Sequence, residues 1–271
     1  MTAPDDEGTR TPLTGWRVLV PRPVAGTSPA VVALAAAGAT AEVVPLIATV
    51  PPQDTGPLDD VLLALGAGWY RWLVLTSAAA VPVLAERAAA AGRTLADVAA
   101  EAKVAAVGPG TARALREAGV DVDLTPPTPS TAQSLVAAWP AAPAERPRVL
   151  FPRGDLAAPT LTDGLRARGW QVDDVVAYRT VPADPPSADV REAWADGRIG
   201  AALLTSASTV RELVTQLGPP PSGTLLVAIG PTTAAEVHRH GLPLAATATA
   251  QTMTGLVEAL SQAAAQAVEE R

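Results

Sequence analysis

An internal duplication is the feature that most constrains the fold of this chain. Residues 104–120, VAAVGPGTARALREAGV, return as residues 226–242, LVAIGPTTAAEVHRHGL, with six of seventeen aligned positions identical. Each copy begins as a short apolar run typical of a buried strand, breaks at Gly-Pro, and resumes with apolar residues at helical spacing. Each copy ends on a glycine, Gly119 or Gly241, which suits the turn after a helix. The pattern predicts a strand, a tight turn and a helix, twice.

The duplication extends over most of the chain. Three further pairs of segments match in sequence: 17–23 with 148–154, 73–84 with 202–213, and 131–139 with 252–260. The two copies therefore span roughly 17–139 and 148–260, and each has the size of a small domain. In both copies, runs rich in Val and Leu end in a polar or glycine turn and lead into an alanine-rich segment. This alternation predicts an α/β fold in which helices cover parallel sheets.

The polar turns that end these strands are the candidate binding positions, because ligands of parallel α/β sheets bind at the carboxyl ends of the strands. Gly, Pro and Thr at a strand-to-helix turn leave backbone N–H groups open to an anion. The candidate residues are Arg22, Thr76, Ser77, Gly108, Thr111, Arg153, Gly154, Thr205, Ser206, Gly230, Thr232 and Thr233. Two plainer interpretations stay open. Such turns also start helices well, and Arg22 and Arg153 could pair with carboxylates such as Asp155.

Proline-rich links bear on how the chain divides into domains. They occupy 51–57 and 182–186, and each follows an extended apolar stretch, 42–50 or 173–181. Either the copies form tandem domains that split near residue 143, or a central domain is inserted into a discontinuous one. The residues do not separate these two arrangements, although the links favour insertion.

One position breaks the symmetry of the two extended stretches. Where the first copy has Ile47, the second has Tyr178. A phenol at an apolar position must satisfy its hydroxyl inside the protein or offer it to a ligand. Tyr178 is therefore either a partly buried structural tyrosine or a functional acid.

Composition narrows the classes of function. With 48% hydrophobic but only 3% aromatic residues, the core must consist mostly of Ala, Val and Leu. The absence of cysteine excludes disulfides, thiolate nucleophiles and cysteine-ligated zinc, and the two histidines, His238 and His240, point in different directions on a helix. We therefore expect no metal site and expect both histidines at the surface.

The net charge of −7 argues against nucleic-acid binding. Residues 1–12 lack the apolar core of a signal peptide, and no membrane segment is evident, so we expect a cytoplasmic protein.

Five motifs in register resemble the uroporphyrinogen-III synthase family. They are Val107-Gly-Pro-Gly-Thr111, Leu150-Phe-Pro-Arg-Gly154, Val176-Ala-Tyr-Arg-Thr180, Leu204-Thr-Ser-Ala-Ser208 and Ile229-Gly-Pro-Thr-Thr233. The resemblance covers about 15–261 and implies two flavodoxin-like parallel-sheet α/β domains, one inserted into the other, joined by a two-stranded connector. The expected division is a disordered leader at 1–13, domain 1 from 14–48 plus 183–261, domain 2 from 49–182, and a tail at 262–271 that frays or lengthens the last helix.

The resemblance also implies an activity. Hydroxymethylbilane loses its terminal hydroxyl, its last pyrrole ring is inverted through a spiro intermediate, and the macrocycle closes as uroporphyrinogen III, with no cofactor. In the resembling family the tyrosine matching Tyr178 is the usual candidate for the acid, and the threonines matching Thr111 and Thr233 line a cleft between the domains. Arg22, Arg153 and Arg179, with helix N-termini, could bind the eight carboxylates of this linear tetrapyrrole. We expect a monomer, with the upstream hydroxymethylbilane synthase as a candidate partner.

Other classes of protein fit less well. A non-catalytic bilobal module that binds a small anion or a tetrapyrrole would share the architecture, and it stays the alternative. A dinucleotide enzyme is disfavoured because Arg113 stands where the third glycine of the phosphate-binding motif belongs. A serine hydrolase would need G-x-S-x-G with a histidine partner, and this motif is absent from the sequence.

Overall fold

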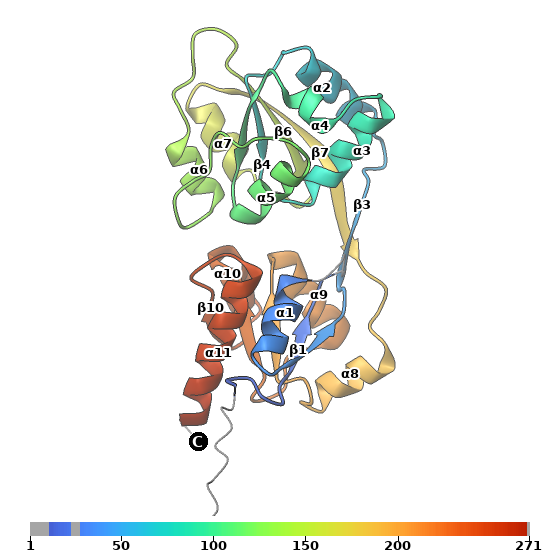
Figure 1. Ribbon diagram of the computed structural model, residues 1–271, viewed down its shortest axis with the longest axis vertical. Coiled ribbons are helices and arrows are strands. Elements are labelled where there is room, and N and C mark those ends of the chain that lie inside the picture. The colour runs from blue at the N-terminus through green and yellow to red at the C-terminus, as the bar shows by residue number, and fades with distance from the viewer. Residues whose placement is uncertain (1–10, 23–27, 270–271) are drawn as a thin grey trace, which may run out of the picture. The chain divides into compact units, whose positions relative to one another are not determined.

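Two α/β units, each built on a five-stranded sheet, make up the computed structural model, which describes residues 11–22 and 28–269 (Figure 1). Unit 1 comprises the residues up to Ala48 together with those from Pro182 onward, and unit 2 is Thr49–Val181. In unit 1, β1 (Arg17–Val20) pairs with β8 (Ala201–Leu204), a strand of the other sequence copy. This pairing excludes tandem domains and confirms the insertion.

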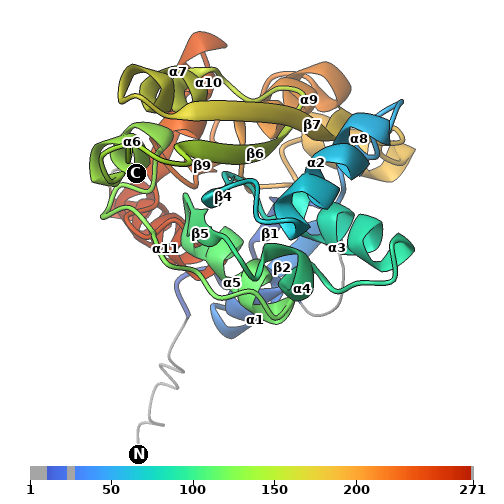
Figure 2. The same ribbon diagram turned by 90° about the horizontal axis from the view of Figure 1, so that it is seen from above.

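The sheet of unit 1 has the strand order β10-β9-β8-β1-β2, with parallel pairings. Val18 and Val20 pack with residues of α1 and α11 on one face, while Leu19 packs with residues of α8, α9 and α10 on the other. Figure 2 shows α1 and α11 on one side of β1 and α9 and α10 on the other. From Val18 to Val20 the strand is therefore apolar, as expected for one covered on both faces. The remaining elements are β2 (Thr40–Val43), β9 (Leu225–Ala228), β10 (Leu244–Thr247), α1 (Pro29–Ala36), α8 (Ala188–Ala195), α9 (Ala207–Leu217), α10 (Pro231–Arg239) and α11 (Met253–Glu269).

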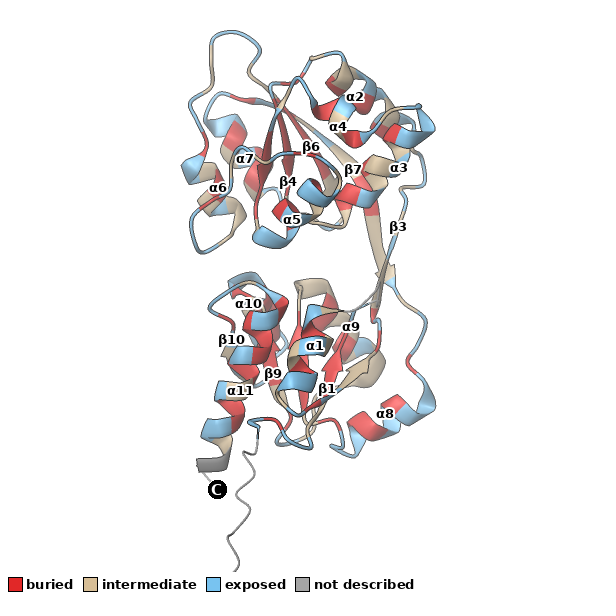
Figure 3. Cartoon of the chain, in the orientation of Figure 1, coloured by how far each residue is buried: buried red, intermediate tan, exposed pale blue. Residues whose placement is uncertain are grey.

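The sheet of unit 2 has the order β3-β7-β6-β4-β5, in which β4 to β7 pair in parallel. Leu73 and Leu75 pack toward α2 to α5, and Trp72 and Val74 pack toward α6 and α7, so the strands are the buried centre of three layers (Figure 3). The elements are β3 (Ile47–Val50), β4 (Trp72–Leu75), β5 (Lys103–Ala106), β6 (Arg148–Gly154), β7 (Gln171–Pro182), α2 (Gly56–Gly66), α3 (Ala80–Ala90), α4 (Leu95–Ala99), α5 (Pro109–Glu117), α6 (Ala132–Ala138) and α7 (Thr160–Ala167).

The two sheets follow the same plan, as the duplication predicts. The run β2-β1-β8-β9 of unit 1 corresponds to β7-β6-β4-β5 of unit 2, and both have the flavodoxin-like order. Equivalent backbone hydrogen bonds recur: the Ile229 N–H donates to the Leu204 carbonyl at 2.9 Å, and the Val107 N–H donates to the Leu75 carbonyl at 3.0 Å. The switch in strand order therefore falls between β1 and β8 in unit 1 and between β6 and β4 in unit 2.

The prediction that residues 42–50 form one continuous extended stretch is wrong. The stretch breaks after β2, which belongs to the sheet of unit 1, and resumes at Ile47 in β3, which belongs to the sheet of unit 2. Pro45 has no N–H to donate to a ladder, and Leu46 is fully buried. The Leu46 carbonyl accepts from the Ala183 N–H at 3.1 Å and from Nε2 of Gln216 at 2.8 Å. These bonds replace the ladder at the break.

The ends of the chain also depart from expectation. Leu13, which we assigned to a disordered leader, is fully buried in the core of unit 1, and its N–H donates to the Ala37 carbonyl at 3.0 Å. Residues 1–10 of that leader lie outside the described residues. The tail lengthens α11, and Ala264 is buried in the same core, so this part of the tail belongs to unit 1. Over the described residues, α11 and the other helices are too short or too polar to span a membrane.

Candidate functional site

Tyr178 lies beside Gly154 at the carboxyl end of β6. The two residues are register partners across β6 and β7, and Tyr178 is only 8% exposed. A Cβ on residue 154 would lie 2.8 Å from Cζ of Tyr178 and 2.9 Å from its hydroxyl oxygen. Real Cβ atoms do not approach other atoms so closely, so the glycine makes room for the ring.

The phenol of Tyr178 has a perturbed environment. Burial raises the pKa of Tyr178, a hydrogen bond with the Ser77 hydroxyl lowers it, and the negative charge of Asp155 raises it further, with a net increase. Asp155 is itself held in place, because its Oδ1 accepts from the Thr180 N–H at 2.9 Å. Tyr178 is therefore protonated at neutral pH and can donate a hydrogen bond, and it is a weaker acid than a free phenol.

The Thr-Ser pairs directly follow β4 and β8, where the helices α3 and α9 are about to begin. Oγ of Ser77 accepts from the Ala79 N–H at 3.2 Å, and Oγ of Ser206 accepts from the Thr209 N–H at 3.2 Å. Ser206 is therefore the N-cap of α9, which confirms the plainer interpretation for that motif. Ser77 instead bonds within the turn before α3, whose N-cap, Ala79, has no side-chain cap. Thr76 and Thr205 are half-buried at the same edges.

The Gly-Pro turns form helix starts that have no side-chain cap. Gly108 and Gly230 are the N-caps of α5 and α10, with extended backbones and proline next. Because glycine has no side chain to accept from the first turn, the N–H groups there are left to water or a ligand. Thr111 and Thr233, three residues further on, are 6% and 3% exposed. Thr232 is exposed on the same turn.

The three candidate arginines differ in how they are engaged. Nε of Arg153 donates to Oδ2 of Asp174 at 2.7 Å, and Nη1 donates to the Gly154 carbonyl at 3.2 Å. The expected carboxylate pairing of Arg153 is thus present, although the partner is not Asp155. Nε of Arg179 donates to the Pro51 carbonyl at 3.4 Å.

Arg22, like Arg179, forms no ion pair with a carboxylate of the described residues. Arg22 is exposed at the end of β1, and its Nη1 lies 3.4 Å from Sδ of Met253.

The two histidines follow a buried acidic residue of α10, Glu236. His238 and His240 are both exposed, as expected. Nε2 of His240 lies 3.4 Å from Oε1 of Glu236, which is only 2% exposed. Glu236 was not singled out, although its partner in the repeat, Ala114, signals a change specific to one copy. Among the described residues, no three His, Asp or Glu side chains gather as metal ligands would.

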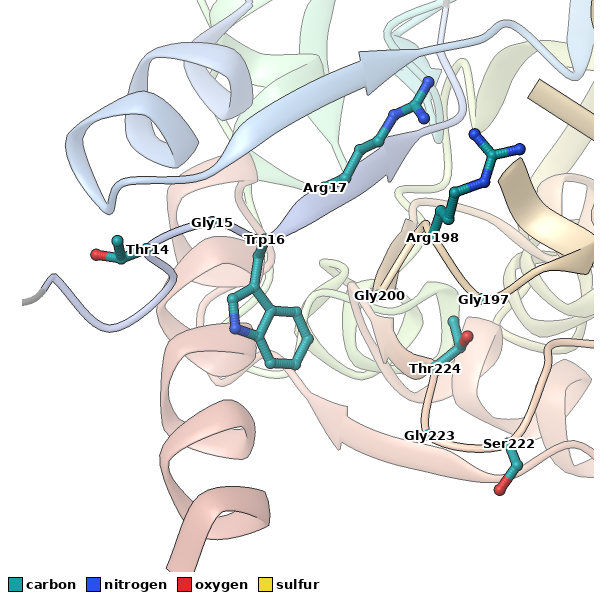
Figure 4. A pocket seen from close by; sticks show the side chains of 10 residues that line it. All are labelled: Thr14, Gly15, Trp16, Arg17, Gly197, Arg198, Gly200, Ser222, Gly223 and Thr224. Carbon is teal, nitrogen blue, oxygen red and sulfur yellow. The ribbon is translucent and has the colours of Figure 1, made fainter. Parts of the chain in front are cut away.

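The cavity shown in Figure 4, of about 410 Å³, lies at the opposite edge of the unit 1 sheet. Arg17 opens β1, and Gly200 and Thr224 precede β8 and β9, so these lining residues stand at the amino ends of the strands. Its arginines are engaged: Arg17 pairs with Glu42 at 2.7 Å, and Arg198 pairs with Asp196 at 3.2 Å. None of the predicted binding residues lines this cavity.

The fold and its polar strand ends define a class: a two-domain flavodoxin-like α/β protein with polar turns at the carboxyl edge of each sheet. Residues 28–258 match the family model described as uroporphyrinogen-III synthase HemD. The chain is also 32% identical over 265 residues to the uroporphyrinogen-III synthase of Synechococcus elongatus, a match that covers 94% of this chain and 98% of the relative. The chain therefore belongs to the uroporphyrinogen-III synthase family.

Solved structures agree with this fold. A mutant uroporphyrinogen III synthase from the extremely thermophilic bacterium Thermus thermophilus matches with a TM-score of 0.62 at 22% identity, covering 93% of this chain and 99% of that one. The uroporphyrinogen-III synthetase of Helicobacter pylori matches with a TM-score of 0.59 at 15% identity, covering 94% and 100%. Both likenesses confirm the two-domain α/β architecture.

Proposed function

We propose that this protein cyclises hydroxymethylbilane to uroporphyrinogen III, with inversion of the terminal pyrrole ring and loss of one water. Membership of the synthase family over nearly the whole chain carries this proposal. The non-catalytic alternative gains no support, since the matching relatives are named as biosynthetic proteins.

The chemistry requires a weak acid and a site that folds the substrate. The electron-rich pyrrole that carries the hydroxymethyl group expels the hydroxyl, which leaves as water once a proton is supplied, and the substituted α-carbon of the ring at the other end attacks the resulting cation to form the spiro intermediate. One bond of the spiro centre then breaks, the released chain end bonds to the free α-carbon of that last ring, and loss of the proton on that carbon completes the macrocycle with the last ring inverted. None of these steps needs a strong protein nucleophile, so a chain without cysteine can catalyse the whole reaction.

We assign the proton donor to Tyr178 and the carboxylate contacts to the strand ends. The raised pKa keeps the phenol protonated, and its position beside Gly154 sets it among the polar turns of unit 2. In unit 1, Arg22 supplies a charged donor, and the first turn of α10 supplies backbone N–H groups together with Thr232 and Thr233.

A rate measurement tests the enzymatic proposal against the binding module. Freshly prepared hydroxymethylbilane closes spontaneously, so its disappearance is followed with and without the protein, in buffer without added metal or cofactor. An enzyme accelerates the loss in proportion to protein concentration. A binding module would leave the spontaneous rate unchanged or slow it, and that result would overturn the proposal.

A further inference from the structure

Glu236 is the one charged residue among the buried polar residues of the described chain. It lies on α10, and its side chain is only 3% exposed. A carboxylate so buried is destabilising unless cations and hydrogen bonds compensate it. The ion pairs of Glu236 therefore show which helices this residue connects.

Two arginines and a histidine surround the Glu236 carboxylate. Nη1 of Arg211 lies 3.1 Å from Oε1, and Nε2 of His240 lies 3.4 Å from the same oxygen. Nη1 of Arg239 pairs with Oε2. Arg239 and His240 follow Glu236 by one helical turn, so among the described residues only Arg211, on α9, pairs Glu236 with another helix.

The pair between Glu236 and Arg211 joins the two helices that begin at the carboxyl edge of the unit 1 sheet. Ser206 is the N-cap of α9, Gly230 is the N-cap of α10, and the two helices pack together. Glu236 follows Thr232 and Thr233 by one helical turn, so it shares their side of α10. Fixing Glu236 therefore fixes the position of the first turn of α10 against the start of α9.

Unit 2 has no equivalent pair at the matching positions. In the aligned copies, Ala114 corresponds to Glu236, and Pro82 corresponds to Arg211. Helices α3 and α5 pack against each other there without this ion pair. The buried pair is thus a property of unit 1, whose turn carries Thr232 where the turn of unit 2 carries Gly110.

We propose that Glu236 is a positioning residue, which through Arg211 holds the first turn of α10 in register with the start of α9 for binding of the substrate carboxylates. This inference rests on the proposed function. Glu236 acts through the backbone N–H groups and the threonines of that turn. Its loss should weaken substrate binding without disabling the proton donor.

Substitution of either partner tests this inference. Glu236→Gln keeps the shape of the side chain and removes its charge, and Arg211→Gln breaks the same pair from the other side. Each should raise KM for hydroxymethylbilane about 3- to 30-fold with little change in kcat. The double variant should raise KM no further than the more affected single variant, because both changes break one link. Glu192→Gln, at an exposed position of α8, is the control and should leave KM unchanged.

The outcomes are separable from failure of the proposed function. If wild-type protein forms no uroporphyrinogen III, the proposed function fails. If wild type is active and the Glu236→Gln and Arg211→Gln variants show only a lowered Tm with wild-type KM, Glu236 is merely structural and the positioning role is wrong. Additive KM effects in the double variant would also contradict it, because they would mean that the two residues act independently.

Discussion

The ring of Tyr178 occupies the space that a side chain on Gly154 would need, since a Cβ there would lie 2.8 Å from Cζ of the tyrosine. Gly154→Ala should therefore displace the ring and destabilise the protein by about 1 to 3 kcal/mol, the usual effect of overpacking. Urea unfolding measures this loss. Combined with Tyr178→Ile, which restores the residue type found at Ile47, Gly154→Ala should have a smaller effect than it has alone. Equal effects in both backgrounds would show that the two residues do not compete for space.

Removal of the Tyr178 hydroxyl tests the assignment of the proton donor. Tyr178→Phe keeps the ring in its place, so Tm should change little, while turnover should fall by about 10² to 10⁴, as for other general acids. Tyr70→Phe is the matched control, because the Tyr70 hydroxyl donates to Oδ2 of Asp173 at 3.0 Å, away from the candidate site. That control should lose about 1 kcal/mol of stability and keep its turnover. Full turnover in Tyr178→Phe would remove the residue from the catalytic assignment.

Arg22 and Arg153 should respond differently to removal. Arg22→Ala should raise KM by the equivalent of about 1.5 to 3 kcal/mol, the value of a charged hydrogen bond, and leave Tm unchanged. Arg153→Ala should raise KM and also lower stability by up to about 1 kcal/mol, since it breaks the partly exposed pair with Asp174. Arg198→Ala, at the opposite edge of the unit 1 sheet, is the control. An unchanged KM in Arg22→Ala would make that arginine dispensable for binding.

Alkaline pH should destabilise the fold through its two tyrosines. Burial raises the pKa of both phenols above 10.0, and for Tyr70 the nearby Asp173 adds to the increase. A raised pKa in the folded state means that the stabilisation is fully present below the pKa of the unfolded phenol, about 10, and is lost as pH rises through the folded values. Urea unfolding between neutral pH and about pH 11 should show this loss, and Tyr70→Phe should reduce it. Phenolate absorbance of both tyrosines near their ordinary pKa, with the fold intact, would contradict the prediction.

Much of the fold can be predicted from the sequence because the two copies of the repeat form equivalent strands and helices. Matching segments of the two copies predicted equivalent strands, and the structure gives them equivalent places in two sheets. The break between β2 and β3 was missed because Val44, Pro45 and Leu46 look like any apolar extended run. Only tertiary hydrogen bonds to the Leu46 carbonyl explain why the chain changes sheets there.

The candidate site was predictable in its location more than in its contacts. Strand ends identify Gly108, Gly230 and Ser206, because turns and caps are local properties of sequence. The partner of Arg153 is Asp174, which lies on a neighbouring strand, and such a pairing depends on sheet register. The burial of Glu236 likewise depends on the packing of α9 against α10, which no local pattern contains.

The isomer composition of the cyclised product tests the central claim most directly. Hydroxymethylbilane is incubated with wild-type protein and without it, and the ring isomers are separated after oxidation to porphyrins. Spontaneous closure yields the symmetric type I isomer, whereas a synthase that inverts the terminal ring yields type III. We predict that type III predominates and that its share rises with protein concentration. A product that stays type I at every protein concentration would contradict the claim that this protein is a uroporphyrinogen-III synthase.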